Sequence, residues 1–296
     1  MRLLLFLLTN LLVVLTISLV AGVFTAMGLL PPDLPLLPLA MGCFLWGMVG
    51  AWLSLQFSAS SAKQMMGVQL LDPRQDHWLV TTVAALAQRA GLPMPEVGIY
   101  DSPEWNAFAT GPSPERALVA VSSGILAGMP AAELEAVLAH ELSHVGNGDM
   151  VTMTLLQGVV NAFVLFLARA IVILLPRSER EGGRQAPPPT LLIWPLELLL
   201  GIAGSLVTAW FSRHREFRAD AGAARLTGPA AMAGALALLG QVSGAVDRRD
   251  GGRLNAFKIA APDGWLLLFA SHPPLEARIR ALQALEPASG ATRWLR

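Results

Sequence analysis

Charge and cysteine are both scarce in this sequence. Only 14% of its 296 residues are charged, whereas a soluble protein usually carries about 25%. The 21 basic and 21 acidic side chains leave no net charge, which disfavours nucleic acid as a partner. A single cysteine, Cys43, excludes an intramolecular disulfide and a cysteine-based zinc cluster. The hydrophobic share of 54% excludes intrinsic disorder.

Two uncharged apolar runs near the N-terminus predict a transmembrane hairpin over residues 1–62. The spans cover about 3–30 and 34–57, and each exceeds the roughly 20 residues that a helix needs to cross a bilayer. The Pro-Pro-Asp sequence at 31–33 forms a turn between them. A cleaved secretory signal is the alternative for the first run, but its apolar part would be only about 7 to 15 residues long.

A second transmembrane hairpin is predicted over residues 151–211, with spans at about 151–175 and 191–211. The two runs flank a polar, Pro-rich stretch, and three arginines in that stretch leave open a shallow hairpin that does not cross fully. Four crossings bring the polar segments 63–150 and 212–296 to the same membrane face, where we expect them to fold as one domain. The distribution of lysine and arginine predicts that this face is cytoplasmic.

Two charged residues lie inside the later apolar runs. Arg169 lies six residues before the end of the third run, and Glu197 lies six residues after the start of the fourth. In an antiparallel hairpin these offsets place both side chains at a similar depth. We therefore expect an ion pair between them, with separate snorkelling of each side chain to the headgroups as the alternative.

The polar segments predict a few helices and short strands. Apolar residues with helical spacing extend over 76–90, and two β-prone runs bounded by Gly, Pro or Ser cover 96–100 and 117–121. A longer helix begins at Pro130 and ends within 146–148, where two glycines lie. The predicted fold class is mainly α with a small β-sheet (α+β), joined to a four-helix integral membrane region.

The longer helix carries the sequence His140-Glu141-Leu142-Ser143-His144, which is the H-E-x-x-H pattern. Histidines four residues apart lie on one face of a helix and can bind one zinc ion. Glu141 is placed to take a proton from a zinc-bound water. A match of five residues also arises by chance, so a third ligand is needed. We interpret Asn147 and Asp149, which follow the motif, as the C-terminal turn of the helix rather than as catalytic residues.

Glu216, within the stretch 212–220, is the predicted third ligand. A catalytic zinc ion typically has three protein ligands and one open position. His144 precedes the third apolar run by seven residues and Glu216 follows the fourth by five, so a returning hairpin brings both to the same membrane face. Asp220, one helical turn further, is placed to accept the outer N–H of a ligand histidine. A solvated charged helix face is the alternative for these two carboxylates.

Taken together, these segments resemble the HtpX-type membrane zinc endopeptidases, relatives of the CAAX prenyl protease. The resemblance covers nearly the whole chain and, beyond the N-terminal hairpin, rests on residues 106–111, 117–121, 140–149, 212–220 and 271–279. It implies one zinc ion per chain on His140, His144 and Glu216, with Glu141 as general base. The zinc would lie in a gluzincin-like protease domain formed by 63–150 and 212–296.

The resemblance also implies two further roles. The run 117–121 is similar to an edge strand that binds an extended substrate by β-augmentation, through Ala117, Val119 and Val121. An ordinary internal strand is the alternative. His272 is expected near the zinc, either as a fourth ligand or as a donor to the developing oxyanion. Its alternative role is to cap the helix that follows.

The leading prediction is a membrane-anchored zinc endopeptidase that cleaves damaged membrane proteins or unfolded polypeptides, in quality control and the stress response. The resemblance implies a multi-pass protein of the bacterial inner membrane with its active site in the cytoplasm. A site-specific processing protease and a non-enzymatic scaffold that holds zinc structurally are the alternatives. A structural zinc site usually has four protein ligands. Here three ligands accompany Glu141, which favours the enzyme.

Overall fold

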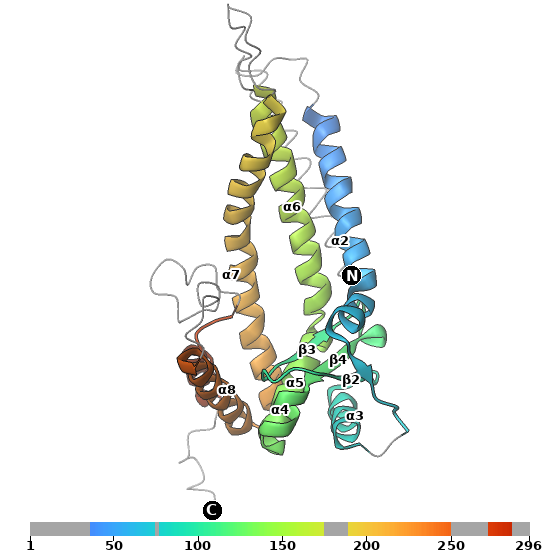
Figure 1. Cartoon of the computed structure of the whole chain (residues 1–296), viewed down its shortest axis with the longest axis vertical. Helices are drawn as coiled ribbons and strands as arrows, with labels where there is room; N and C mark the ends of the chain where they lie inside the picture. The colour runs from blue at the N-terminus through green and yellow to red at the C-terminus, as the bar shows by residue number, and fades with distance from the viewer. Residues whose placement is uncertain (1–35, 75–76, 175–188, 250–271, 286–296) are drawn as a thin grey trace, which may run out of the picture. The chain divides into compact units, whose positions relative to one another are not determined.

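The computed structural model describes residues 36–74, 77–174, 189–249 and 272–285 (Figure 1). The predicted first span, 3–30, and its alternative as a cleaved signal lie outside the described residues, as does most of the stretch between the third and fourth runs. The chain divides into two compact units. One contains residues 1–54 and 153–208, and the other contains residues 55–152 and 209–296.

Three described helices are long and apolar enough to cross a membrane: α2 (Leu36–Met66), α6 (Asp149–Leu174) and α7 (Ile193–Thr227). At 1.5 Å per residue, the 35 residues of α7 extend over about 50 Å, more than the roughly 30 Å of a hydrocarbon core. The helix does not end where the apolar run ends at Phe211, because no glycine or proline lies between Gly204 and Gly222. One continuous helix therefore carries both an apolar segment and the predicted third ligand.

Within the first unit, α2 and α6 approach each other at glycine and alanine residues. A Cβ atom at Gly47 would lie 2.8 Å from the carbonyl oxygen of Gly158, and one at Gly158 would lie 2.6 Å from the Cβ of Ala51. Small residues of this kind let two helix backbones pack closely in a membrane, where dispersion contacts replace the hydrophobic effect. Several large apolar side chains of α2, Trp46 and Trp52 among them, are instead exposed.

The predicted ion pair between the third and fourth runs is confirmed. Arg169 on α6 contacts Glu197 on α7 at 2.6 Å between Nη1 and Oε1, and it also donates a hydrogen bond of 3.0 Å to the carbonyl of Leu165. Both charged side chains are partly buried. Pairing satisfies two ions that would each be costly in an apolar environment, so separate snorkelling was the wrong alternative.

The second unit contains a four-stranded sheet with strand order β1-β2-β4-β3. β2 and β4 are parallel, whereas the two outer strands are antiparallel to their neighbours. Besides α5 (Ala131–Asn147), the elements of this unit are β1 (Gln69–Leu70), α3 (Trp78–Ala90), β2 (Glu96–Tyr100), β3 (Ala107–Thr110), β4 (Leu118–Ser122), α4 (Ser123–Gly128), α8 (Pro229–Arg249) and α9 (Leu275–Gln283), together with a 3-10 turn at Pro114–Arg116. A second such turn, Pro189–Leu192, precedes α7. The predicted mainly α fold with a small sheet is confirmed.

Helix α5 lies at the centre of this unit and packs against α3, β3, β4 and α8. Its apolar face buries Leu134, Leu138 and Leu142 fully. They join one core with Val119 of β4 and Leu236 of α8. The catalytic motif is therefore placed on the best-packed helix of the unit, which limits the freedom of its side chains.

Strand β4 is internal, so the prediction of an edge strand at Ala117, Val119 and Val121 was wrong. All five residues of β4 are buried, and the strand pairs on both sides, with β2 and with β3. A continuous apolar run is typical of a strand covered on both faces. Within the described sheet, β3 is the outer strand on that side, and its short Ala-Phe-Ala-Thr sequence gave no clear strand signal.

We expect Gly158→Leu to destabilise the α2–α6 contact by about 1 to 3 kcal/mol, because a larger side chain cannot fit against Ala51. Thermal unfolding of the purified protein in detergent measures this effect. Gly50→Leu is the matched control, since a Cβ at Gly50 would meet no atom within 4 Å. Equal unfolding temperatures for the two variants would contradict the close approach.

Candidate active site

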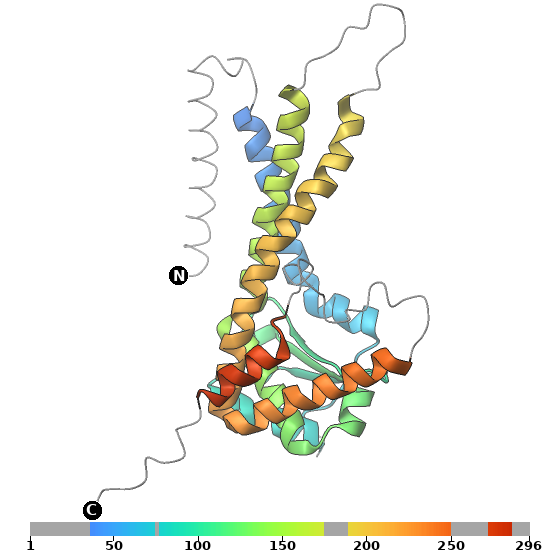
Figure 2. The same cartoon turned by 90° about the vertical axis from the view of Figure 1, so that its left-hand side faces the viewer.

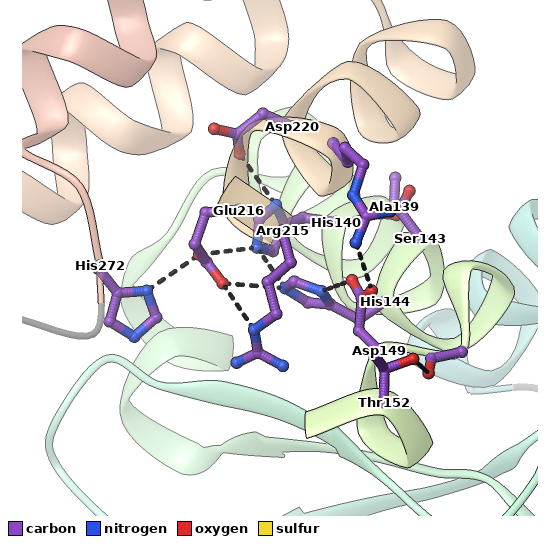
Figure 3. Close-up of polar contacts among 12 residues, drawn as sticks. Ala139, His140, Ser143, His144, Asp149, Thr152, Arg215, Glu216, Asp220 and His272 are labelled. Atoms are coloured by element: carbon purple, nitrogen blue, oxygen red, sulfur yellow. Dashed lines mark hydrogen bonds and ion pairs between the residues drawn. The ribbon is translucent and has the colours of Figure 1, made fainter. Parts of the chain in front are cut away.

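The structure brings the three predicted ligands together (Figure 3). His140 and His144 lie one turn apart on α5, Glu216 comes from α7, and their ligand atoms all lie within 4.8 Å of one another. The two histidine Nε2 atoms are 3.1 Å apart. Glu216 Oε1 lies 3.3 Å from Nε2 of His144, and Oε2 lies 3.6 Å from Nε2 of His140. All three side chains are buried.

These residues fit a zinc ion. Glu216 Oε1 is buried and has no hydrogen-bond partner, and Nε of Arg215 approaches it only to 3.8 Å. A buried oxygen without a hydrogen bond costs free energy, which a bound cation would compensate. Two imidazole nitrogens face the same point as this oxygen. Two nitrogens and one carboxylate oxygen form the ligand set of many catalytic zinc sites, which leave one position open.

Two carboxylates orient the ligand histidines through their outer ring nitrogens. Asp149 Oδ2 lies 2.8 Å from Nδ1 of His144, and Asp220 Oδ1 lies 3.0 Å from Nδ1 of His140, although this second N–H is not aligned for a regular hydrogen bond. Such contacts hold the ring and its tautomer. Asp220 lies beside the outer nitrogen of a ligand histidine, as the sequence predicted. The interpretation of Asp149 as no more than a helix turn was wrong.

Gly148 explains how Asp149 reaches a histidine of the preceding helix. It ends α5 in the left-handed conformation (φ 68°), which favours glycine, and α6 begins at the next residue. The abrupt turn brings the first side chain of α6 back onto His144. An aspartate that follows a helix-ending glycine, five residues after a ligand, was the signal that could have identified it.

A second glycine lets α7 approach α5. A Cβ atom at Gly222 would lie only 2.5 Å from Oγ of Ser143, so the helices cross here without a side chain between them. Asp220 lies two residues before this crossing on the same helix, and Glu216 lies six residues before it. Gly222 therefore allows both carboxylates to reach the histidines, and the sequence alone gave no sign of it.

Glu141 and His272 both line a cavity next to the ligands. The same cavity is lined by His140 and Glu216, by Trp105, Asn106 and Ala107 near β3, and by apolar side chains of α4, α5 and α8. His272 Nδ1 lies 2.9 Å from Oε2 of Glu216, and the side chain is 60% exposed. It does not cap α9, whose N-cap is Pro274 with no side-chain hydrogen bond. Its part in the reaction stays a prediction.

Comparison with known proteins decides the family. The model of peptidase family M48 matches residues 73–286 of this chain. The chain belongs to peptidase family M48. It is 46% identical over 292 residues to Protease HtpX of Aeromonas hydrophila, a match that covers 95% of this chain and 99% of that protein. It is 49% identical over 250 residues to the Protease HtpX homolog of Methylacidiphilum infernorum, covering 81% and 83%.

A solved structure shows the same fold at low identity. The crystal structure of S. mikatae Ste24p superposes with a TM-score of 0.61 at 21% identity, covering 93% of this chain and 66% of that chain. At this identity the likeness supports the fold alone. The family supports the chemistry, and the predicted resemblance to HtpX-type proteases is confirmed. The chain is a membrane zinc protease, and its site offers a zinc ligand set. The domain boundaries at 62, 150 and 211 stay predictions.

The pKa of His144 indicates that protons compete with zinc for this site. Burial lowers the pKa, but Asp149 and Glu216 outweigh burial and raise it from 6.5 to about 9 in the metal-free protein. The ring is thus protonated at neutral pH, whereas a metal ligand must be neutral. In the metal-free protein this proton stabilises the fold below about pH 6.5, and the contribution is lost as the pH rises through about 9.

We expect the apparent zinc affinity to increase about tenfold per pH unit between pH 7 and 9, because one proton leaves His144 for each zinc ion bound. Competition with a chelator of known pH dependence measures this affinity in detergent. Chelated protein should also unfold at a lower temperature at pH 9 than at pH 6.5. An affinity that does not vary with pH would contradict the raised pKa.

Proposed function

We propose that this chain is an endopeptidase that hydrolyses misfolded or damaged membrane proteins, with zinc on His140, His144 and Glu216. The proposal rests on one observation. These three buried side chains converge beside a cavity that Glu141 also lines. Their chemistry is that of a catalytic site, since three ligands leave one position for water or substrate.

Each residue has a distinct part in the reaction. When bound, zinc supplies Lewis acidity that activates water and polarises the scissile carbonyl. Glu141 accepts the proton of the attacking water and passes it to the leaving amine. Asp149 and Asp220 keep the imidazole rings in place, so the ligands need no reorganisation during the reaction. His272 lines the same cavity, and its proposed part is to donate a hydrogen bond to the oxyanion.

The outer edge of β3 is the proposed binding site for an extended substrate. The amide of Ser122 donates to the carbonyl of Asn106. In an antiparallel pair every second residue bonds to the same neighbouring strand, so Phe108 also bonds to β4. The backbone groups of Ala107 and Ala109 therefore point away from β4, to the free edge of the described sheet. Ala107 lines the same cavity as Glu141. A substrate strand on this edge would be bound through its main chain, which suits a protease that accepts many sequences.

The positions of lysine and arginine support a proposal about the membrane and about the face on which the active site lies. The relatives and the three apolar helices make this a membrane-bound bacterial protein. We propose the inner membrane, with the active site on the cytoplasmic face, because Lys63, Arg213, Arg215 and Arg218 all lie next to the apolar runs on the side of the site. Protease protection of the site in inverted and right-side-out vesicles tests this orientation.

We expect Glu141→Gln to lower the rate of casein cleavage by at least about 10²-fold, since the general base is lost. The variant should bind zinc as the wild type does, because Glu141 is not a ligand. Cleavage in detergent, with and without chelator, and metal analysis of both proteins measure these effects. Unchanged turnover in the variant would defeat the proposed mechanism.

We expect Ala107→Pro to lower kcat/KM for an unfolded substrate by about tenfold, because the missing N–H is one that faces the free edge of β3. The ladder to β4 is unaffected, since Ala107 does not bond to it. Ala107→Ser, which keeps the N–H, is the control. Equal kcat/KM for both variants, at equal zinc content, would exclude binding at this edge.

A further inference from the structure

Arg278 is a buried cation that contacts Glu216 and Asp220, the two buried acidic residues of α7. It comes from α9, is 6% exposed, and donates two hydrogen bonds to Asp220, 2.8 Å from Nε to Oδ2 and 2.6 Å from Nη2 to Oδ1. Its Nη1 lies 3.4 Å from Oε2 of Glu216. A guanidinium fork of this kind fixes a carboxylate in both position and angle.

The two oxygens of Glu216 have different surroundings. Oε2 contacts Arg278 at 3.4 Å and His272 at 2.9 Å, both from the segment 272–285. Oε1 has no hydrogen-bond partner; it lies 3.3 Å from Nε2 of His144 and forms an ion pair of 3.8 Å with Nε of Arg215. The segment 272–285 therefore makes the shortest contacts of Oε2, whereas Oε1 keeps no hydrogen bond and faces His144, where a metal ion would bind it.

Asp220 links Arg278 to α5, the helix that carries the two ligand histidines. Its Oδ1, held by Arg278, contacts Nδ1 of His140 at 3.0 Å. Removing Arg278 would leave the buried carboxylate of Asp220 without its guanidinium partner, and would leave Arg215, at 3.8 Å, as the arginine beside Glu216. Unpaired buried charges move toward solvent or take up protons. Either response would disturb a ligand and the residue that orients a second ligand.

Helix α9 is itself held by packing that does not involve the metal. It lies against α8, as Figure 2 shows, with Leu282 buried in the common core and Leu275 close to Gly240. Arg278 lies on the buried side between these contacts. Docking of α9 therefore places the guanidinium where the metal ligands need it.

We propose that Arg278 is a positioning residue of the metal site, which fixes Glu216 and Asp220 and so couples the docking of α9 to metal binding. This inference rests on the proposed zinc ligands. The coupling is reciprocal: if a docked α9 strengthens zinc binding, zinc must strengthen the docking of α9 by the same factor.

Zinc affinity provides the first test, in the Glu141→Gln background so that the protein cannot cleave itself. Arg278→Gln should weaken zinc binding by about 10- to 100-fold in chelator competition. Arg278→Lys keeps the charge but not the fork, so an intermediate loss is expected. Arg280→Gln is the control, because Arg280 is exposed on the same helix and, among the described residues, its Nε donates to the carbonyl of Glu276. Wild-type affinity in both Arg278 variants would overturn the proposal.

The visible spectrum of cobalt-substituted protein separates positioning from a general loss of stability. Arg278→Lys should shift the cobalt bands while the protein stays folded, since the ligand geometry changes. A lower unfolding temperature with unchanged bands would assign Arg278 a structural role only and overturn the proposal.

Hydrogen exchange of residues 272–285 tests the reciprocal effect. Zinc should slow exchange of this segment in the Arg280→Gln protein and have a much smaller effect in Arg278→Lys. Equal protection by zinc in both would exclude the coupling. Absence of zinc binding in the Glu141→Gln parent would instead refute the proposed metal ligands, so the two failures are distinguishable.

Discussion

The burial of the Glu216 carboxylate against two imidazoles is the constraint on which the second unit depends. A carboxylate that is 1% exposed, with one oxygen unbonded, is stable only if cationic groups surround it. Those groups come from α5, from Arg215 of α7 itself, from His272 and α9 and, in the active enzyme, from zinc. The helices that carry them must therefore meet at one point, and two glycines, Gly148 and Gly222, remove the obstacles to that meeting.

Two residues of the metal site lie on helices that also carry long apolar segments. Glu216 lies on α7, whose earlier part is apolar enough to span, and Asp149 is the first residue of α6. Both residues lie outside the predicted spans 151–175 and 191–211, close to one end of each in the sequence. His144 and Glu216 are 72 residues apart in the sequence, and the helices that carry them nevertheless bring their side chains within ligand distance.

The sequence predicted the parts of the site that depend on local periodicity. His140 and His144 follow from helical spacing, and Asp220 from its position one turn after Glu216. The return of the apolar runs correctly indicated that Glu216 meets the histidines. Arg278 was missed because it lies 58 residues from Asp220, and sequence distance says nothing about such a contact. The substrate edge was misplaced because an apolar run signals burial, not the side on which a sheet ends.

Charge balance explains why this site suits a dication. Asp149, Glu216 and Asp220 are buried carboxylates, and Arg278 is the one buried arginine among the described residues. Arg215 and Arg218 also form ion pairs with Glu216 and Asp149, but they are more exposed than the carboxylates. The buried part of the site therefore carries more negative than positive charge. Burial lowers the pKa of both ligand histidines, but the carboxylates that face their rings outweigh burial and raise it. In the metal-free protein, protons therefore supply part of the positive charge that the buried carboxylates require. A divalent ion brings more positive charge to this point than one proton does, so exchange of protons for the metal favours the loaded site.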